Sequence, residues 1–376
     1  METTRKKQNL FLLCPVRHVL ILLSGAVILA HLLTRGDHDW NAWLSEHFVR
    51  RVHLALSGAC ARVPFSVAEL LIGLAAVGIV CYLIASLVRI LRDEHKLRQV
   101  YRLVASLLCF GLLVYAGFCL LWGVYYYGDD FAAKSGLDAG EISTEELAAV
   151  TEYFALLCNE YAPQVPRDAN GVCATDRAAV LAQSPLVYAR TERDYPCLAG
   201  PPLRAKPVFF SRVMSYTDFT GFFFPFTAEA NVNMDFPPSL FASTVAHELA
   251  HQRGVAKEQE ANFCAVLASL EYGDPDYCYS ACLLAYTHLG NALYSADHAA
   301  WERIADELTE PVLRDFAWNR AYWRQFDTPV QTVSNTVYEG FLQSYDQVLG
   351  LRSYGACVDL LTNYYYDEAV AYISSH

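Results

Sequence analysis

The sequence predicts a mainly α protein with three N-terminal transmembrane helices, followed by an α+β domain with a small sheet. Two observations support this prediction. Three long apolar runs lie within the first 128 residues of a chain that is 54% hydrophobic and 18% charged. Charge divides at the same point: residues 1–128 hold 13 Lys and Arg against 7 Asp and Glu, and residues 129–376 hold 15 against 33. We therefore expect a membrane domain over 1–128 and an extracytoplasmic domain over 129–376.

The three apolar runs extend over about 18–34, 64–91 and 103–125. Each is long enough to cross a bilayer, although the first is at the short end of the usual range. No small-x-small cleavage site stands out after the first run, and further runs follow, so it is interpreted as an uncleaved anchor rather than a signal peptide. Glu69, near the start of the second run, is expected at the interface, the alternative being a functional acid within the membrane.

Basic residues predict the orientation of these spans. They lie before the first run and between the second and third, at Arg5, Lys6, Lys7, Arg17, Arg89, Arg92, Lys96, Arg98 and Arg102. Because basic loops stay in the cytoplasm, three spans place residues 126–376 outside, in a multi-pass protein of the cell membrane. An aromatic cluster is then expected to form the outer interfacial belt, at Trp122, Tyr125, Tyr126 and Tyr127. Residues 35–62 are expected to be a polar loop, and the acidic second domain is not expected to bind nucleic acid.

The most informative motif is His247-Glu248-Leu249-Ala250-His251, an HExxH sequence. On a helix, residues four apart share a face, so the two imidazoles project side by side. Two imidazoles placed in this way can bind one Zn²⁺, and Glu248 between them can reach a water molecule. Gly254 is expected to end this helix in a left-handed conformation.

A third ligand is expected just after the glycine. Glu258 and Asn262 are four residues apart on a second predicted helix that runs to about Glu271. Glu258 completes a His₂Glu ligand set, and the Asn262 amide oxygen can accept a hydrogen bond from the free ring N–H of a ligating histidine. Glu260 is the alternative metal ligand, but it points roughly 200° around the helix from Glu258.

HELAH followed by ExxAN resembles the gluzincin metallopeptidases, which have an HExxH motif and a glutamate in a downstream helix. The likeness covers about twenty residues and implies a zincin-like domain with a zinc cofactor. Gluzincins usually place tens of residues before that glutamate, whereas Glu258 follows His251 by seven positions. The Gly254 turn is similar instead to the metzincin motif HExxHxxGxxH. Its third-histidine position holds Lys257, however, which cannot ligate while protonated.

The whole chain resembles a bacterial membrane family known as domain of unknown function 3810. The features shared with it are three hydrophobic segments, the stretch PFT-EAN-N at 225–233, HELAHQRG, EANF and a late Ser353-Tyr354-Gly355. This resemblance implies the membrane topology rather than a particular substrate.

Strands are expected at 206–210, 221–226 and 227–233, with a break at Pro225. By analogy, a strand just before an HExxH helix is the edge strand that holds a peptide substrate. Glu229, Asn231 and Asn233 alternate and therefore share one face of their strand, where they either line the cleft or solvate an edge.

Further helices are expected after a cap at Ser143 and over about 277–294, 297–317, 329–349 and 353–366. Of the twelve cysteines, eight fall outside the spans, and Cys158, Cys173 and Cys197 are the ones most expected to form disulfides. Cys278 and Cys282 are interpreted as a helical packing pair rather than a second metal site.

Together these motifs predict a membrane-anchored zinc metallopeptidase that hydrolyses peptide or protein substrates outside the membrane. Glu248 is the expected general base, acting on a water activated by zinc. The oxyanion needs a further donor, and the candidates are Tyr354, Tyr338, His288 and Arg352. For His288 and His298, however, a position on the surface of a helix is preferred.

Two other functions are weighed against this one. The first is a non-catalytic membrane receptor or scaffold with a structural zinc site, which would have no use for Glu248. The second is intramembrane proteolysis, which the charged surroundings of the motif disfavour, with Arg253, Lys257, Glu258 and Glu260 close by.

Overall fold

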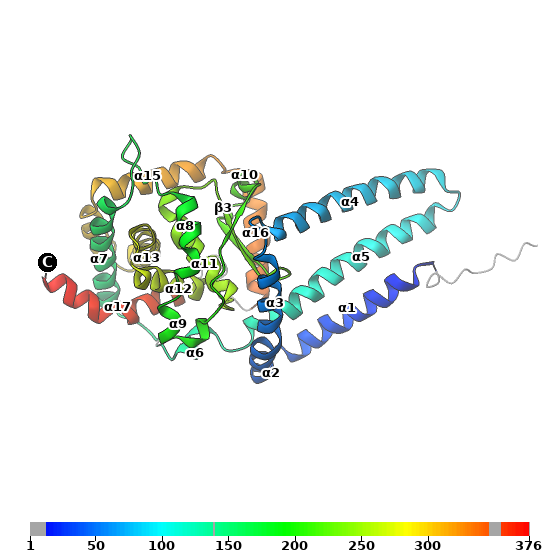
Figure 1. Cartoon of the computed structure of the whole chain (residues 1–376), viewed down its shortest axis with the longest axis horizontal. Coiled ribbons are helices and arrows are strands. Elements are labelled where there is room, and N and C mark those ends of the chain that lie inside the picture. Colours follow the sequence, from blue (N-terminus) through cyan, green and yellow to red (C-terminus); the bar gives the residue numbers. More distant parts are fainter. Residues whose placement is uncertain (1–12, 138–139, 346–354, 376) are drawn as a thin grey trace, which may run out of the picture. The chain divides into compact units, whose positions relative to one another are not determined.

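The computed structural model describes residues 13–137, 140–345 and 355–375 (Figure 1). These residues divide into two compact units. The first unit holds the described residues up to Arg51 together with Val67–Gly128, and the second holds Val52–Ser66 together with the described residues from Asp129 onward. Residues 52–66, expected in the membrane domain, therefore pack with the second unit.

In the first unit, three helices are long and apolar enough to cross a membrane: α1 (Pro15–Thr34), α4 (Val67–Arg92) and α5 (Lys96–Leu121). The structure therefore contains as many candidate spans as the sequence predicts. The helices expose most of their leucine and valine side chains, as segments surrounded by lipid do. Helix α5 begins and ends several residues earlier than expected.

Two expectations for the first 128 residues are wrong. Residues 35–62 are largely helical, with α2 (His38–Leu44), a π-helical turn η2 (Ser45–Val49) and α3 (Arg50–Cys60). The Asp37 side chain caps α2 by accepting a hydrogen bond from the backbone N–H of Trp40. In the expected aromatic belt, the side chains of Trp122, Tyr125 and Tyr126 are buried. The indole N–H of Trp122 donates to the Tyr126 hydroxyl, so these rings pack inside the protein.

The second unit contains a three-stranded sheet with the order β1-β3-β2. The strands are β1 (Lys206–Val208), β2 (Gly221–Phe224) and β3 (Glu229–Asn233), which confirms the three strands predicted. Central strand β3 runs parallel to β1 and antiparallel to β2, with Gly221 opposite Val232 and Phe224 opposite Glu229. Strand β2 is therefore an edge of the sheet, and β3 is not.

Helices make up the rest of the second unit. Helix α7 (Thr144–Tyr161) begins with a capping box formed by Ser143 and Glu146, as its sequence indicates. The region expected as one helix over 297–317 is divided into two at residues 307–309. The remaining helices are α6 (Phe131–Ser135), α8 (Arg177–Gln183), α9 (Thr191–Asp194), α10 (Ser211–Tyr216), α11 (Phe241–Gln252), α12 (Glu258–Tyr272), α13 (Pro275–Ala296), α14 (His298–Asp306), α15 (Glu310–Arg324), α16 (Pro329–Ser344) and α17 (Gly355–Ser375).

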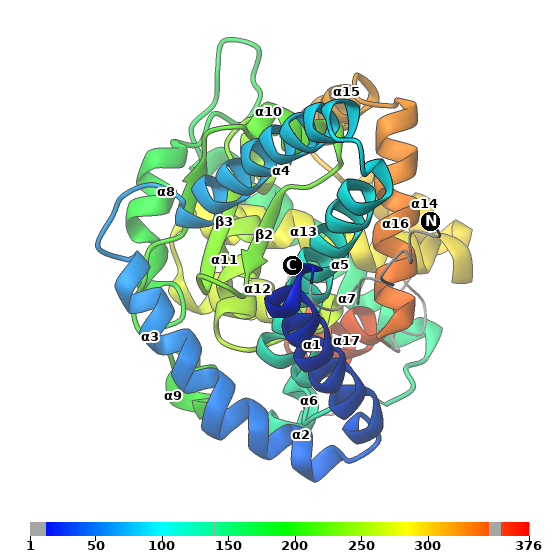
Figure 2. The same ribbon diagram turned by 90° about the vertical axis from the view of Figure 1, so that its right-hand side faces the viewer.

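Helices α11, α12 and α13 form the centre of the core, and α11 also packs against β2 and β3 (Figure 2). Alanines make this close packing possible, because Ala242, Ala246 and Ala250 of α11 are all fully buried. All twelve cysteines lie among the described residues, and none of them is joined in a disulfide, so the expected pairing among Cys158, Cys173 and Cys197 is wrong. The HExxH helix is therefore held between the sheet and two core helices by packing and by hydrogen bonds, among them one from the Tyr188 hydroxyl to the Ala246 carbonyl at 2.9 Å.

Candidate metal centre

The turn after α11 brings the two motifs together. Gly254 has a φ of 90°, a left-handed conformation that favours glycine. The backbone N–H of Val255 donates to the Ala250 carbonyl at 3.1 Å, which closes the end of the helix. The chain then reverses and begins α12 at Glu258. The first residue of α12 therefore faces the side of α11 that carries the two histidines.

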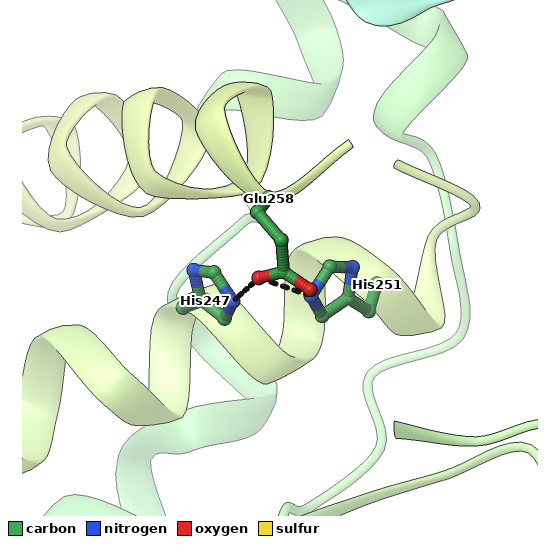
Figure 3. Close-up of side chains that lie close together, drawn as sticks. All are labelled: His247, His251 and Glu258. Atoms are coloured by element: carbon green, nitrogen blue, oxygen red, sulfur yellow. Dashed lines mark hydrogen bonds and ion pairs between the residues drawn. The ribbon is translucent and has the colours of Figure 1, made fainter. Parts of the chain in front are cut away.

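Three side chains meet at this point (Figure 3). His247 Nε2 lies 3.1 Å from Glu258 Oε2, and His251 Nε2 lies 3.5 Å from the same oxygen. One donor atom from each residue lies within 4.8 Å of the other two. The structure thus brings together the residues expected to be the three metal ligands, each presenting a nitrogen or oxygen to a common point.

The protonation of the His251 ring suits a ligand. Its Nδ1 lies 2.6 Å from the carbonyl oxygen of Val255, which can only accept a hydrogen bond. In the neutral ring Nδ1 therefore carries the proton, and Nε2 is the nitrogen that can present a lone pair to the cluster. Asn262 was expected to fix a ligating histidine, but within the described ranges it makes no hydrogen bond to either imidazole. For His251, the backbone carbonyl of Val255 accepts the ring hydrogen bond that Asn262 was expected to accept.

Glu258 is positioned by a residue distant in sequence. The Tyr338 hydroxyl of α16 donates to Glu258 Oε1 at 2.7 Å, which leaves Oε2 directed at the histidines. Partial burial works to raise the pKa of Glu258, but His251 and His247 outweigh it and hold that pKa well below its usual range. Burial likewise works to lower the pKa of His251, and Glu258 raises it to about 9. The cluster therefore holds an anionic carboxylate that favours positive charge at its centre.

This donor set fits zinc. Two imidazole nitrogens and one carboxylate oxygen are a common ligand set of catalytic zinc sites. The backbone acceptor behind His251 and the hydroxyl behind Glu258 provide the outer hydrogen bonds that such ligands normally have. The geometry of the described side chains therefore agrees with the metal that the sequence motif indicates.

Glu248 lies beside the cluster and is 4% exposed. Its Oε2 atom is buried and has no hydrogen-bond partner in the described part of the chain. Burial raises the pKa of Glu248 to about 7, against the opposing effect of His247 and His251. A buried carboxyl group with an unused oxygen is uncommon, and it is typical of a group kept for chemistry.

Edge strand β2 passes directly against this carboxyl group. A Cβ atom added at Gly221 would lie 2.5 Å from Glu248 Oε1 and 2.7 Å from its Cγ. Only glycine allows the strand to approach so closely. The sequence contains a signal for this contact, since a glycine that begins the strand GFFF indicates a close approach of the backbone to another group.

The residues expected either to line the substrate cleft or to solvate an edge are instead buried in the sheet. Glu229, Asn231 and Asn233 lie on central β3 and are at most 2% exposed. Lys206 Nζ is 3.9 Å from Glu229 Oε1, Ser66 donates to Asn231 Oδ1 at 2.6 Å, and Asn233 Nδ2 donates to the Phe219 carbonyl at 2.9 Å. The prediction of an edge strand was wrong for β3 because alternation cannot distinguish a central strand from an edge strand.

Glu260, the alternative ligand, is directed away from the cluster. Its two carboxylate oxygens accept hydrogen bonds from the backbone N–H groups of Phe131 at 2.9 Å and Ala132 at 3.0 Å. Glu260 thus binds backbone N–H groups of the first turn of α6, which have no partner within that helix. Burial raises its pKa, and the neighbouring Asp130 adds to this effect.

The four candidate oxyanion donors lie in different places. Tyr354 and Arg352 lie outside the described residues. Tyr338 lies at the cluster, where it binds Glu258. His288 was expected on the surface of a helix, but it is buried, and burial lowers its pKa to about 4, with a smaller effect in the same direction from His247. It is therefore a neutral side chain close to His247, whereas His298 is exposed as expected.

Comparison with known proteins places the chain in a family but assigns no activity. No curated protein and no solved structure matches the chain. A family model described as a protein of unknown function, DUF3810, matches residues 45–362, which is well over half of the sequence and includes His247, Glu248, His251 and Glu258. The chain therefore belongs to the DUF3810 family.

Proposed function

We propose that this protein is a membrane-anchored zinc metallopeptidase that hydrolyses peptide bonds on the outer side of the cytoplasmic membrane. One observation carries the proposal. Donor atoms of His247, His251 and Glu258 gather within 4.8 Å, and the buried Glu248 carboxyl group beside them has an oxygen with no hydrogen-bond partner among the described residues. A structural zinc site would have no use for that group.

The proposed ligands are His247, His251 and Glu258. When bound at such a site, zinc supplies Lewis acidity, which lowers the pKa of water and polarises a carbonyl group. Tyr338 acts as a positioning residue, because its hydroxyl holds one oxygen of Glu258 and directs the other to the centre. The Val255 carbonyl has the same role for the ring of His251.

Glu248 acts as general base and then as general acid. Its raised pKa, about 7, suits proton transfer near neutral pH. Glu248 takes a proton from the attacking water, whose oxygen forms a bond to the carbonyl carbon of the peptide. The carbon–nitrogen bond then breaks, and Glu248 delivers the proton to the leaving amine. The products are a carboxylic acid and an amine, with water the only other reactant.

The membrane location rests on α1, α4 and α5. The basic residues before α1 and between α4 and α5 support a cytoplasmic position for both segments, so three spans leave the second unit outside the cytoplasm. Substrates are then peptides or proteins of the extracytoplasmic space.

Zinc content and cleavage test this proposal together. The full-length chain would be purified in detergent, and bound zinc would be measured by elemental analysis for the wild type, Glu248→Gln, Glu258→Ala and Glu260→Ala. Each protein would also be incubated with a mixed peptide library. We expect one zinc per wild-type chain, retained in Glu248→Gln and Glu260→Ala but lost or weakened in Glu258→Ala. Cleavage is expected only where both zinc and Glu248 are present.

Other outcomes would contradict parts of the proposal. Zinc held fully by Glu258→Ala would remove Glu258 from the ligand set. A wild type that binds zinc but cleaves no peptide would favour the non-catalytic receptor or scaffold. A folded wild type without zinc would refute the metal centre itself.

A further inference from the structure

The second unit exposes a group of large apolar side chains, here called the apolar face. It comprises Phe65, Phe209, Phe210, Val213, Tyr216, Val330, Val333 and Val337. Phe209 is 84% exposed and Val337 68% exposed, far more than large apolar side chains of a water-soluble surface usually are. Contiguous exposed apolar groups of this kind typically mark a site of contact with a protein or a membrane.

The members of the apolar face come from segments that are joined to one another. The Ser334 hydroxyl of α16 donates to the Thr217 carbonyl at 3.0 Å, just after α10. Asn335 Nδ2 donates to Asp218 Oδ2 at 3.1 Å. These bonds hold α16 beside the end of α10, as Figure 1 also shows. Phe209 and Phe210 directly precede α10, so the helices and the two phenylalanines form one region.

The point where the chain leaves the second unit for the membrane lies at this same region. Lys206 Nζ donates to the carbonyl oxygens of Cys60 at 3.1 Å, Val63, and Phe65 at 3.4 Å. Lys206 begins β1, and β1 continues directly into Phe209. Helix α4 begins at Val67, and only Ser66 separates it from Phe65. Because α4 is apolar enough to cross a membrane, the bilayer surface must begin close to Phe65.

The charge of this region is also distinct. Residues 129–376 hold 33 acidic and 15 basic residues. The segments that form the apolar face, 52–66, 195–217 and 329–344, contain a single acid, Glu339, and the exposed Asp218 follows directly and is bonded to Asn335. Their basic residues are Arg62, Arg204, Lys206 and Arg212. All but Lys206 are exposed, and Arg212 is paired with Asp235 at 2.9 Å. Basic residues beside exposed aromatic rings are typical of surfaces that contact phospholipid.

We propose that the apolar face rests in the interfacial layer of the same bilayer that α1, α4 and α5 cross. Phe209 and Phe210 enter the boundary between head groups and acyl chains, and the exposed valines of α16 lie along it. Arg62 and Arg204 face the phosphate groups. Helix α16 also carries Tyr338, whose hydroxyl binds Glu258, so this contact keeps the metal centre close to the membrane surface. The proposal depends on the membrane spans and not on peptidase activity.

Lipid photolabelling tests the contact directly. The full-length chain would be reconstituted into vesicles of phosphatidylcholine and phosphatidylglycerol that contain a phospholipid with a diazirine in its acyl chain. After illumination and proteolysis, labelled peptides would be identified by mass spectrometry. We expect labelling of the peptides that contain residues 205–217 and 329–344, in addition to the three spans. Peptides that contain the exposed Leu186, Leu313 and Val370 serve as internal controls and should remain unlabelled.

A double variant, Phe209→Ser with Phe210→Ser, sharpens the test. Both side chains are exposed, so the variant should keep the thermal stability of the wild type. It should lose labelling not only at 205–217 but also at 329–344, whose sequence is unchanged. The matched variant Leu186→Ser should alter neither peptide.

Two outcomes would overturn the proposal. In the first, the wild-type peptides 205–217 and 329–344 are labelled no more than the Leu186 and Leu313 peptides while the spans are labelled. In the second, these two peptides stay unlabelled and cross-link to the same peptides of a second chain, which would assign the apolar face to a dimer. Zinc content and cleavage would be measured on the same samples, so failure of lipid contact is distinguishable from failure of the metal centre.

Discussion

Two buried carboxyl groups of the second unit have opposite surroundings. Asp315 is 1% exposed and accepts three hydrogen bonds, from Arg167 Nη1 at 3.1 Å, the Tyr279 hydroxyl at 2.5 Å and the Cys173 backbone N–H at 2.7 Å. Glu248 is 4% exposed, and its Oε2 has no hydrogen-bond partner among the described residues. Burial removes both carboxyl groups from bulk water. Only for Asp315 do protein hydrogen bonds to both oxygens replace those that water would make.

This difference distinguishes a carboxyl group that stabilises the fold from one that is available for proton transfer. A buried carboxylate that only stabilises the fold needs hydrogen bonds and an opposite charge, because an unpaired buried charge costs several kcal/mol. Asp315 has both, and it joins α15 to the loop at Cys173 and to α13. Glu248 has an oxygen, Oε2, without a hydrogen-bond partner among the described residues, and it lies where the backbone of Gly221 approaches it. We infer that Glu248 lowers the stability of the fold, which is common for groups retained for catalysis.

The largest expected effect tests this comparison at Asp315. Asp315→Asn should destabilise the protein by about 3 kcal/mol or more, since it leaves Arg167 without its counter-charge. Glu248→Gln should leave the stability unchanged or raise it. Unfolding of the full-length chain in detergent would be followed by circular dichroism, with the exposed Asp327→Asn as control. Equal losses in Asp315→Asn and Glu248→Gln would show that the two groups do not differ.

A second prediction concerns the approach of β2 to Glu248. Gly221→Ala would place a methyl group about where Glu248 Oε1 now lies, and the carboxyl group must move. A displacement of this size is expected to lower kcat/KM by about 100-fold. Zinc content should be retained, because Gly221 does not touch the ligands. Gly340→Ala is the matched control, since nothing lies within 4 Å of its added Cβ. Full activity in Gly221→Ala would mean that Glu248 need not stay where it lies.

A third prediction compares two histidines with opposite shifts. Glu258 raises the pKa of His251, whereas burial lowers the pKa of His53 to about 4 despite a hydrogen bond to the Pro225 backbone. His53 is thus disfavoured as a cation in the folded state. Its stabilising contribution is complete above the unfolded pKa of about 6.5 and is lost as the pH falls toward about 4. Between pH 7 and pH 5 this loss amounts to about 2 kcal/mol.

Stability measured against pH in the wild type and in His53→Gln would check this. The wild type should lose more stability than the variant between pH 7 and pH 5, whatever their difference at pH 7. The variant His298→Gln, at an exposed position, should follow the wild-type profile. Parallel profiles for wild type and His53→Gln would contradict the prediction.

The smallest expected effect is at Tyr338. Tyr338→Phe removes the hydroxyl that donates to Glu258 Oε1 and should weaken zinc affinity by about tenfold. Affinity would be measured by competition with a chromophoric chelator. Tyr294→Phe, at an exposed position of α13, is the control. Unchanged affinity in Tyr338→Phe would show that Glu258 holds its orientation without this bond.

The sequence by itself determined the features that depend on neighbouring residues. Apolar runs defined three helices, the capping residues Ser143 and Glu146 defined the start of α7, and Gly254 defined the end of α11. The spacing of His247, His251 and Glu258 also predicted that they would converge, because helix periodicity and a single tight turn set their positions. In each case the contacts join residues a few positions apart, so a local pattern contains the necessary information.

Only the tertiary structure decided the features that join distant segments. Strand β3 became central because β1 pairs with it from more than twenty residues away, which buried Glu229, Asn231 and Asn233. Glu260 turned to the backbone of Phe131, and Tyr338 reached Glu258 from α16. Residues 52–66 joined the second unit through Lys206. Periodicity shows which face of an element a side chain occupies, but what lies opposite that face depends on packing across the whole fold.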